Sequence, residues 1–152
     1  MSTLAYNKRA SYDYEILEKY EAGLVLLGHE VKSIKTGHIS LKGSYVTAKT
    51  ENGKTEFYLT NAHIPLYKHA STIIDYDPER PRKLLLSKKE ISRLIGKKKE
   101  QGLTLVPIKV YTKHSLIKME FGIGKGKKMI DKRESIKKRE MDRSIRTLTK
   151  MK

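Results

Sequence analysis

The stretch Leu116-Ile-Lys-Met-Glu-Phe-Gly-Ile123 has an apolar residue at positions 117, 119, 121 and 123, with Leu116, Lys118 and Glu120 between them. Successive side chains of a strand point to opposite faces of its sheet, so this alternation predicts a strand with one buried face. The apolar segment 103–111 predicts the strand that precedes it in an antiparallel hairpin. The sheet is therefore expected to have one apolar side.

A second hairpin is predicted by the segments Ser44–Thr50 and Thr55–Thr60, which are rich in β-branched and aromatic residues. Between them lies Asn52-Gly53, and Asn-Gly is a strong hairpin signal because both turn positions need a positive φ. Earlier still, Tyr12–Tyr20 alternates as a strand does, although its acidic residues leave a helix possible. The apolar residues 24–27 are expected to continue that strand past a bend at the preceding glycine.

Two helices are expected beside these strands. Residues 28–37 contain two apolar residues at helical spacing and finish with Gly37, which suits a helix end. Ser87 and Glu90 form a capping-box pattern in front of another apolar stretch at helical spacing. Gly102 then marks the end of this second helix.

Residues 61–83 contain three of the four prolines and show no sustained period, so we expect a long surface loop there. Strands outnumber helices, and a sheet with one apolar side can remove its exposed edges by closing into a small barrel. The predicted fold class is therefore mainly β, an OB-like closed antiparallel barrel of about six strands with flanking helices.

The composition indicates a polyanionic partner. The chain has 33 Lys and Arg against 17 Asp and Glu, a formal net charge of +16, and a polyanion relieves such self-repulsion. No apolar run approaches the length of a membrane span, and residues 1–7 lack the apolar core of a signal peptide. The absence of Cys excludes disulfides and thiolate zinc sites. We interpret the chain as a cytoplasmic nucleic-acid-binding protein with no membrane partner.

The positive charge is concentrated at the C-terminal end. Residues 125–152 contain 12 Lys and Arg and 4 Asp and Glu, a net charge of +8 over 28 positions. Their apolar residues form a stripe too thin to pack on a core, which is typical of a segment that orders only on a partner. We therefore predict two parts: residues 1–124 form the nucleic-acid-binding barrel, and residues 125–152 form a basic tail, disordered alone and helical when bound.

Three other kinds of site are disfavoured. Residues 122–128 are rich in glycine and lysine, but they lack the spacing of a dinucleotide loop and the Ser or Thr of a P-loop, so a flexible junction is the better interpretation. The five histidines include no helical pair with a carboxylate, so neither a metal site nor a cofactor is predicted. No nucleophile motif is present, and we predict that the protein is not an enzyme and has no catalytic residues.

Nine tyrosines and no tryptophan stand out in a chain that is expected to bind nucleic acid. Tyrosine rings can stack on unpaired bases, but most are expected to pack in the core with the hydroxyl at its rim. Tyr67, in the long loop, is the residue that we expect to stack on a base.

Seven short blocks follow one another between Asn7 and Arg133, within a resemblance that covers essentially residues 7–146. They are Asn7-Lys8-Arg9-Ala10, Tyr20-Glu21-Ala22-Gly23, Gly28-His29-Glu30-Val31-Lys32-Ser33, Arg82-Lys83-Leu84-Leu85-Leu86, Leu103-Thr104-Leu105-Val106-Pro107, Gly124-Lys125-Gly126-Lys127-Lys128 and Asp131-Lys132-Arg133. In this order they resemble the SmpB family of bacterial tmRNA-binding proteins. Each block alone would be a weak signal, but seven in register are specific.

The resemblance implies a role in trans-translation. Members of the family bind the tRNA-like domain of tmRNA (SsrA RNA), assist its alanylation and its delivery with elongation factor Tu, and bring it to stalled ribosomes. The implied partners are tmRNA, the ribosome with its 16S rRNA and, through tmRNA, elongation factor Tu and alanyl-tRNA synthetase. The family's tail lies in the decoding centre and along the vacant mRNA channel, its body is an OB-like barrel, and a monomer is expected.

The resemblance also assigns residues to the two RNA partners. Those that would bind tmRNA are Asn7, Lys8, Arg9, Glu21, Leu85 and Lys118, and those that would bind the ribosome are Lys125, Lys127, Lys128, Ile130, Asp131, Lys132 and Arg133. Glu21 would accept hydrogen bonds from base amino groups or hold a neighbouring cation, and Leu85 would pack under an exposed base. Family members often carry His or Tyr at the position of Ile130, which would make an apolar contact where a ring would stack.

A structural ribosomal protein with a basic extension is the alternative function, because it would share the composition, the barrel and the tail. The number of copies per ribosome distinguishes the two functions. A structural component stays on every ribosome through high salt, whereas a rescue factor is substoichiometric and co-purifies with tmRNA.

Overall fold

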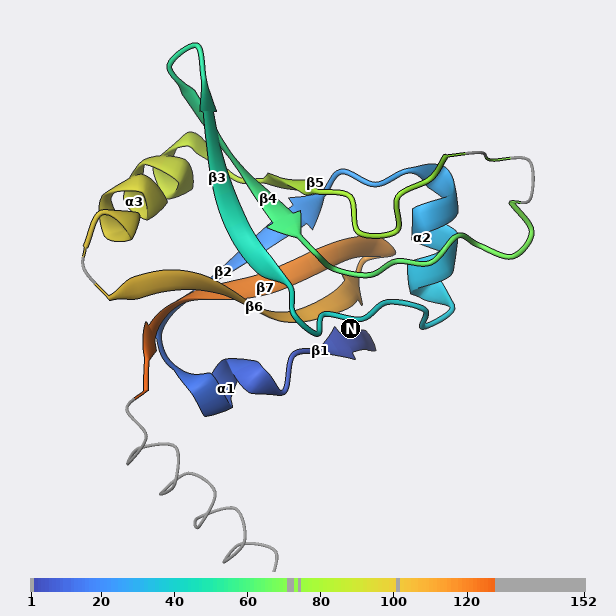
Figure 1. The fold of residues 1–152 in the computed structure, drawn as a ribbon, viewed down its shortest axis with the longest axis horizontal. Coiled ribbons are helices and arrows are strands. Elements are labelled where there is room, and N and C mark those ends of the chain that lie inside the picture. Colours follow the sequence, from blue (N-terminus) through green and yellow to red (C-terminus); the bar gives the residue numbers. More distant parts are fainter. Residues whose placement is uncertain (1, 71–72, 74, 101, 128–152) are drawn as a thin grey trace, which may run out of the picture.

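The fold is that of a computed structural model, which describes residues 2–70, 73, 75–100 and 102–127. One seven-stranded antiparallel sheet has the order β1-β6-β7-β2-β5-β4-β3 (Figure 1). Its strands are β1 Ser2–Tyr6, β2 Tyr14–Leu24, β3 Tyr45–Glu51, β4 Lys54–Thr60, β5 Arg82–Leu85, β6 Leu103–Lys113 and β7 Leu116–Gly126. The helices in the described residues are α1 Arg9–Asp13, α2 Gly28–Lys35 and α3 Lys88–Lys98. The class is therefore mainly β, as predicted, with seven strands where about six were expected.

The hairpin of β6 and β7 is confirmed, together with its alternation. Ile117, Met119, Phe121 and Ile123 of β7 are all buried, whereas Leu116 on the opposite face is 60% exposed. The turn between the strands is made by His114 and Ser115, which both have a positive φ. Neither is glycine, which explains why the sequence contains no turn signal at this point.

The second predicted hairpin is also confirmed. Strands β3 and β4 pair in unbroken register from Tyr45 opposite Thr60 to Glu51 opposite Lys54. At the turn, Asn52 has φ +50° and Gly53 has φ +76°, which are the left-handed values that an Asn-Gly turn requires.

The first predicted strand is confirmed as β2, and the helical alternative is excluded for most of its length. The strand begins at Tyr14, because residues 9–13 form the short helix α1, so the prediction was wrong for Tyr12. It ends at Leu24, so the expected continuation through residues 25–27 was also wrong. β2 pairs with β7 along nearly its whole length and with β5 at its end, which places it in the middle of the sheet.

Both predicted helices are present. α2 ends just before Gly37, which has φ +84°. α3 begins after Ser87, whose hydroxyl accepts a hydrogen bond from the Glu90 N–H at 3.2 Å while the Glu90 carboxylate accepts one from the Ser87 N–H at 3.0 Å. This is the reciprocal capping box that the sequence predicts.

The sequence did not predict the two short strands. β1 pairs with β6 at one edge of the sheet, and β5 lies between β2 and β4. The expected surface loop was therefore wrong for its last two residues, Arg82 and Lys83, which begin β5. It was also wrong in placing the whole segment at the surface, because Ala62 and Ile64 are fully buried in the main core.

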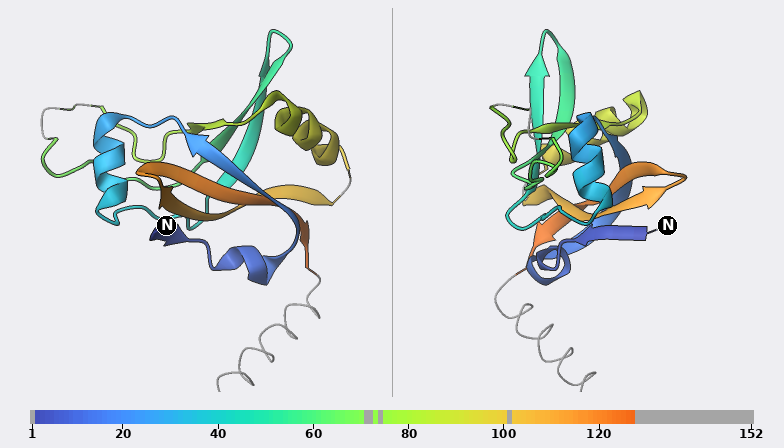
Figure 2. Two further views of the ribbon diagram at one scale, coloured as in Figure 1. Left: turned by 180° about the vertical axis from the view of Figure 1, so that it is seen from behind. Right: turned by 90° about the vertical axis from the view of Figure 1, so that its right-hand side faces the viewer.

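The sheet curls strongly, so that β3 lies against β6 although the two are far apart in the strand order (Figure 2). The main core fills the space inside this curl, with side chains from β2, β4, β6 and β7 and from the inner sides of α2 and α3. In the described part of the chain, β1 and β3 are the two edge strands of the sheet and are not hydrogen-bonded to each other. The closed form of the barrel therefore stays a prediction.

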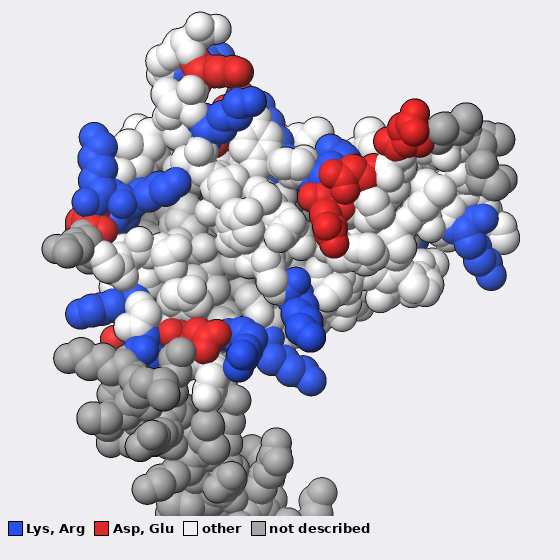
Figure 3. Space-filling model, in the orientation of Figure 1, with Lys and Arg blue, Asp and Glu red and all other residues white. Residues whose placement is uncertain are grey.

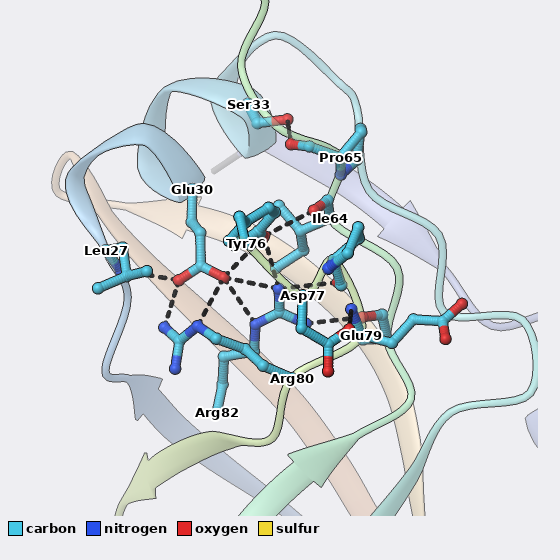
Figure 4. Close-up of polar contacts among 12 residues, drawn as sticks. Leu27, Glu30, Ser33, Ile64, Pro65, Tyr76, Asp77, Glu79, Arg80 and Arg82 are labelled. Atoms are coloured by element: carbon cyan, nitrogen blue, oxygen red, sulfur yellow. Dashed lines mark hydrogen bonds and ion pairs between the residues drawn. The ribbon is translucent and has the colours of Figure 1, made fainter. Parts of the chain in front are cut away.

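A buried carboxylate joins α2 to the long loop and to β5 (Figure 4). Neither Glu30 nor Arg82 has any exposed surface. Two Arg82 nitrogens, Nε and Nη2, donate to Glu30 Oε2 at 2.9 Å and 2.6 Å. Arg80 Nε donates to the same oxygen at 3.1 Å, and Leu27 N–H donates to Glu30 Oε1 at 2.8 Å.

Arg82 also holds the backbone of the loop. Its Nη1 donates to the carbonyl of Ala62 at 2.7 Å, and its Nη2 donates to the carbonyl of Pro78 at 2.9 Å. The Tyr76 hydroxyl lies 3.0 Å from Glu30 Oε2 and 2.7 Å from the carbonyl of Ile64. Buried polar groups are tolerated when they are hydrogen-bonded in this way.

The environment keeps Glu30 ionised. Burial raises the pKa of its carboxyl, but hydrogen bonds from Arg80, from the Leu27 N–H and from Arg82 outweigh burial and lower the pKa to about 2. A carboxylate with a depressed pKa stabilises the fold above its unfolded pKa, and this contribution is lost as the pH falls toward 2.

We predict that Glu30→Gln lowers the free energy of unfolding by about 3–5 kcal/mol, because two guanidinium groups then lose the charge that compensates them. Urea denaturation at neutral pH measures this loss. Glu79→Gln is the matched control: it makes the same charge change at a half-exposed side chain that pairs with His63, and it should cost less than about 0.5 kcal/mol. Equal effects of the two substitutions would contradict the role of the buried carboxylate.

Candidate nucleic-acid interface

The register of the strands brings three of the predicted site residues together. Gly23 in β2 lies opposite Leu85 in β5 and opposite Lys118 in β7, so these three residues are neighbours across the sheet. Glu21 precedes Gly23 by two positions and therefore lies on the same face. Residues 85, 21 and 118 are separated by up to 97 positions in the chain, and only the sheet makes them one surface.

We call this surface the outer face, since it lies opposite the core side of the sheet. Its residues come from β5, β2, β7 and β6 and are Leu85, Lys19, Glu21, Gly23, Lys118, Glu120, Lys109, Tyr111 and Lys113.

Most of the lysines on the outer face are already paired. Lys19 and Lys109 lie 3.5 Å and 3.4 Å from the two carboxylate oxygens of Glu120, and Lys113 lies 3.4 Å from Glu21. Lys118 makes no ion pair with another residue of the described part of the chain, so its ammonium is available to a phosphate. Basic side chains also occur elsewhere: Figure 3 shows them over α3 and on the β3–β4 hairpin.

Glu21 is held at the centre of the outer face. The Tyr111 hydroxyl donates to Glu21 Oε2, and Lys113 Nζ lies 3.4 Å from Oε1. The hydrogen bond from Tyr111 lowers the pKa of Glu21 more than the positive charge of Lys113 does. The side chain remains 39% exposed. An oriented, ionised carboxylate of this kind can accept further hydrogen bonds from the amino groups of bases.

Leu85 stands at the rim of a shallow hollow. It is 54% exposed, and the hollow of about 240 Å³ beside it is lined by Gly23, Leu26, Val31 and Leu116, among others. A Cβ atom at Gly23 would come within 3.3 Å of Leu85 Cδ1, so the missing side chain contributes to the opening. The hollow presents apolar groups next to the ammonium of Lys118, a combination that suits a base and its phosphate.

The predicted residues near the N-terminus lie at the edge of the sheet formed by β1 and β6, away from β5. Asn7 has a structural role: its N–H donates to the Ile108 carbonyl at 2.7 Å, and its side-chain amide donates to the Pro107 carbonyl at 2.8 Å. Lys8 and Arg9 are exposed. Arg9 lies 3.8 Å from Asp13, and its guanidinium lies over the Tyr12 ring. The structure thus places Lys8 and Arg9 apart from Leu85.

Two of the residues predicted to bind the ribosome, Lys125 and Lys127, lie at the end of the described chain. Residues 122–126 belong to β7, so the flexible junction predicted for residues 122–128 was wrong there, and Lys125 lies opposite Leu103. Lys127 donates from its N–H to the Asp13 carbonyl at 2.9 Å and from its ammonium to the Ser11 carbonyl at 2.8 Å. The remaining predicted residues lie outside the described residues, and they are Lys128, Ile130, Asp131, Lys132 and Arg133.

Tyr67, expected to stack on a base, is half-buried, with its ring edge against His69 at a centroid distance of 5.2 Å and Lys32 above it. The residues that sequence reasoning missed are Tyr111 and the paired lysines at positions 109 and 113. These three residues alternate along β6, and this alternation was the sequence signal that they share one face of the sheet.

Two further observations concern the described residues alone. No three His, Asp or Glu side chains gather there as a metal ion would require. No helix in this part of the chain has the length and the apolar character needed to cross a membrane.

Comparison with known proteins matches this chain over nearly its whole length. Residues 4–151 match the SmpB protein family. The SsrA-binding protein of Thermosipho melanesiensis is 52% identical over 151 residues and 99% of each chain. That of Carboxydothermus hydrogenoformans is 51% identical over 93% of this chain and 92% of its own. A solved structure described as "tmRNA-SmpB: a journey to the center of the bacterial ribosome" has a chain that is 47% identical, with a TM-score of 0.64 over 82% of this chain and 84% of that chain.

The contact between Tyr111 and Glu21 generates a prediction about pH. Burial raises the pKa of Tyr111, and the negative charge of Glu21 raises it further because it opposes the phenolate. Glu21→Gln should therefore lower the pKa of Tyr111, as followed by ¹³C NMR titration of the tyrosine Cζ atoms. In the control Glu56→Gln, the pKa of Tyr58 should fall while that of Tyr111 does not move, because Glu56 accepts its hydrogen bond from Tyr58. An unchanged Tyr111 in Glu21→Gln would contradict the contact.

Proposed function

The chain belongs to the SmpB family, and from this membership we propose that it binds tmRNA and acts with it on the ribosome in trans-translation. The observation that carries the proposal is 52% identity to an SsrA-binding protein over 99% of both chains. The outer face adds physical support, because it combines an exposed apolar side chain, an oriented carboxylate and an unpaired ammonium in one place.

In this proposal the outer face recognises the tRNA-like domain of tmRNA. Glu21 accepts hydrogen bonds from base amino groups, Leu85 packs under an unpaired base, and Lys118 contacts a phosphate. Asn7 acts indirectly, since its hydrogen bonds to β6 hold the start of the segment that carries Lys8 and Arg9. Because Tyr111 and Lys113 hold the Glu21 carboxylate in place, the loss of orientational freedom on binding is small.

The basic tail contacts the ribosome in this proposal. Residues 125–152 carry the dense positive charge, and the group from Lys125 to Arg133 would meet 16S rRNA in the decoding centre before the tail orders along the vacant mRNA channel. Elongation factor Tu and alanyl-tRNA synthetase act through tmRNA. The body is an OB-like closed barrel, and the protein works as a cytoplasmic monomer without catalysing a reaction itself.

Glu21→Ala tests the outer face. The substitution makes the protein more basic, which by charge alone would strengthen RNA binding. We instead expect the dissociation constant for the tRNA-like domain to rise by about 5- to 150-fold, because base-specific hydrogen bonds worth about 1–3 kcal/mol are lost. Fluorescence anisotropy at constant salt measures the affinity.

The matched control for that experiment is Glu79→Ala, which makes the same charge change in the long loop. It should leave the affinity unchanged or raise it slightly. If Glu21→Ala bound as tightly as this control, Glu21 would have no part in RNA recognition.

Removal of residues 128–152 tests the division of labour. A chain that ends at Lys127 keeps the whole sheet and the contacts of Lys127 with α1. Its dissociation constant for the tRNA-like domain should stay within about twofold of that of the full chain, a difference in binding free energy of less than about 0.5 kcal/mol. Peptide tagging on ribosomes stalled at the end of a message should be lost. Equal loss of both activities would overturn the assignment of separate RNA partners to body and tail.

A further inference from the structure

Tyr6 is an exposed ring on a well-held backbone. It is the last residue of β1 and is 54% exposed. The backbone on either side is anchored to β6, because Ala5 lies opposite Val110 and the Asn7 N–H donates to the Ile108 carbonyl at 2.7 Å. The ring is therefore presented to solvent from a fixed point of the sheet.

The register places Tyr6 on the outer face. Tyr6 lies opposite Lys109, which lies opposite Glu120, which lies opposite Glu21. Residues directly opposite each other in antiparallel strands project to the same side. Tyr6 and Glu21 thus belong to one row that crosses β1, β6, β7 and β2, and Tyr6 lies at its open end.

Tyr6 differs from the other tyrosines in what surrounds its ring. Within the described residues it makes no hydrogen bond and no ring contact. Of the others, Tyr45 is the one with a comparable exposure, 46%, but it is on β3 at the far end of the strand order. The remaining tyrosines are packed or engaged, and they are Tyr12, Tyr14, Tyr20, Tyr58, Tyr67, Tyr76 and Tyr111.

The surroundings of Tyr6 suit a nucleotide. Lys8 follows it by two positions in the chain and is exposed, so a cation is available for a phosphate beside a stacked base. Four inter-strand spacings separate β1 from β5, a span of about 19 Å. A single-stranded segment of about 4 nucleotides can cross such a distance.

We propose that Tyr6 is a stacking platform for an unpaired base of the RNA that binds the outer face. This inference rests on the proposed function and extends it: the RNA crosses the face from Leu85, through the hydrogen-bonding centre at Glu21, to the ring of Tyr6. An aromatic ring accepts any base, so Tyr6 contributes affinity for a single-stranded stretch and little base specificity.

The test compares Tyr6→Phe, Tyr6→Leu and the control Tyr45→Leu, with the tRNA-like domain of tmRNA as the probe. Tyr6→Phe keeps the ring and should bind as the wild type does. Tyr6→Leu should raise the dissociation constant by about 5- to 150-fold, the range found for loss of one base–aromatic stack. Tyr45→Leu removes a comparably exposed ring from β3, which takes no part in the row of residues through Glu21, and should have no effect.

Ultraviolet cross-linking of the wild-type protein to the same RNA gives a second measurement that needs no variant. Mass spectrometry should find an RNA adduct on Tyr6 and none on Tyr45. Wild-type affinity in Tyr6→Leu, or the absence of an adduct on Tyr6, would overturn the inference and leave the proposed function standing. Failure of the proposed function gives a different result: the wild type itself would bind the tRNA-like domain no better than a plain RNA duplex of equal length.

Discussion

The structure depends on one buried carboxylate, that of Glu30. An isolated ion in this position would cost several kcal/mol, so the fold has to bring compensating groups to it. Arg80 and Arg82 do so, and Arg82 in turn holds the carbonyls of Ala62 and Pro78. One constraint thus fixes the path of a loop with little regular structure and the start of β5. Because β5 carries Leu85 three positions later, the apolar end of the outer face is positioned by a carboxylate on α2.

The sequence predicts those parts of the fold whose information is local. The β3–β4 hairpin follows from Asn52-Gly53, and α3 follows from its capping box, because each signal lies within a few residues. The strands β1 and β5 could not be predicted in this way. Each has at most five residues, and each is stable only because it pairs with strands distant in the chain. The same holds for Arg82, whose burial depends on a carboxylate 52 positions away.

The candidate site follows a similar rule. The family blocks assign Glu21, Leu85 and Lys118, and the sheet register explains why residues so far apart can act together. The partner that orients Glu21, Tyr111, is 90 positions distant, and its alternation with Lys109 and Lys113 indicates a shared face of the strand but not its contact with Glu21. Asn7 shows the opposite case. The family blocks assign this residue to RNA contact, and its side-chain amide donates to a carbonyl of β6, so in the proposed function it shapes the segment that carries Lys8 and Arg9.

The distribution of paired and unpaired charge explains how one small chain can serve two RNA partners. On the outer face Lys19, Lys109 and Lys113 already pair with carboxylates, so little of the net charge of +16 is available there. In the proposed function, recognition by that face therefore relies on shape, stacking and oriented hydrogen bonds. In residues 125–152 basic residues outnumber acidic ones by 12 to 4, and this excess favours attraction to any RNA surface. In the proposed function, selectivity thus resides in the sheet, where most lysines of the outer face are paired, and non-selective attraction resides in residues 125–152.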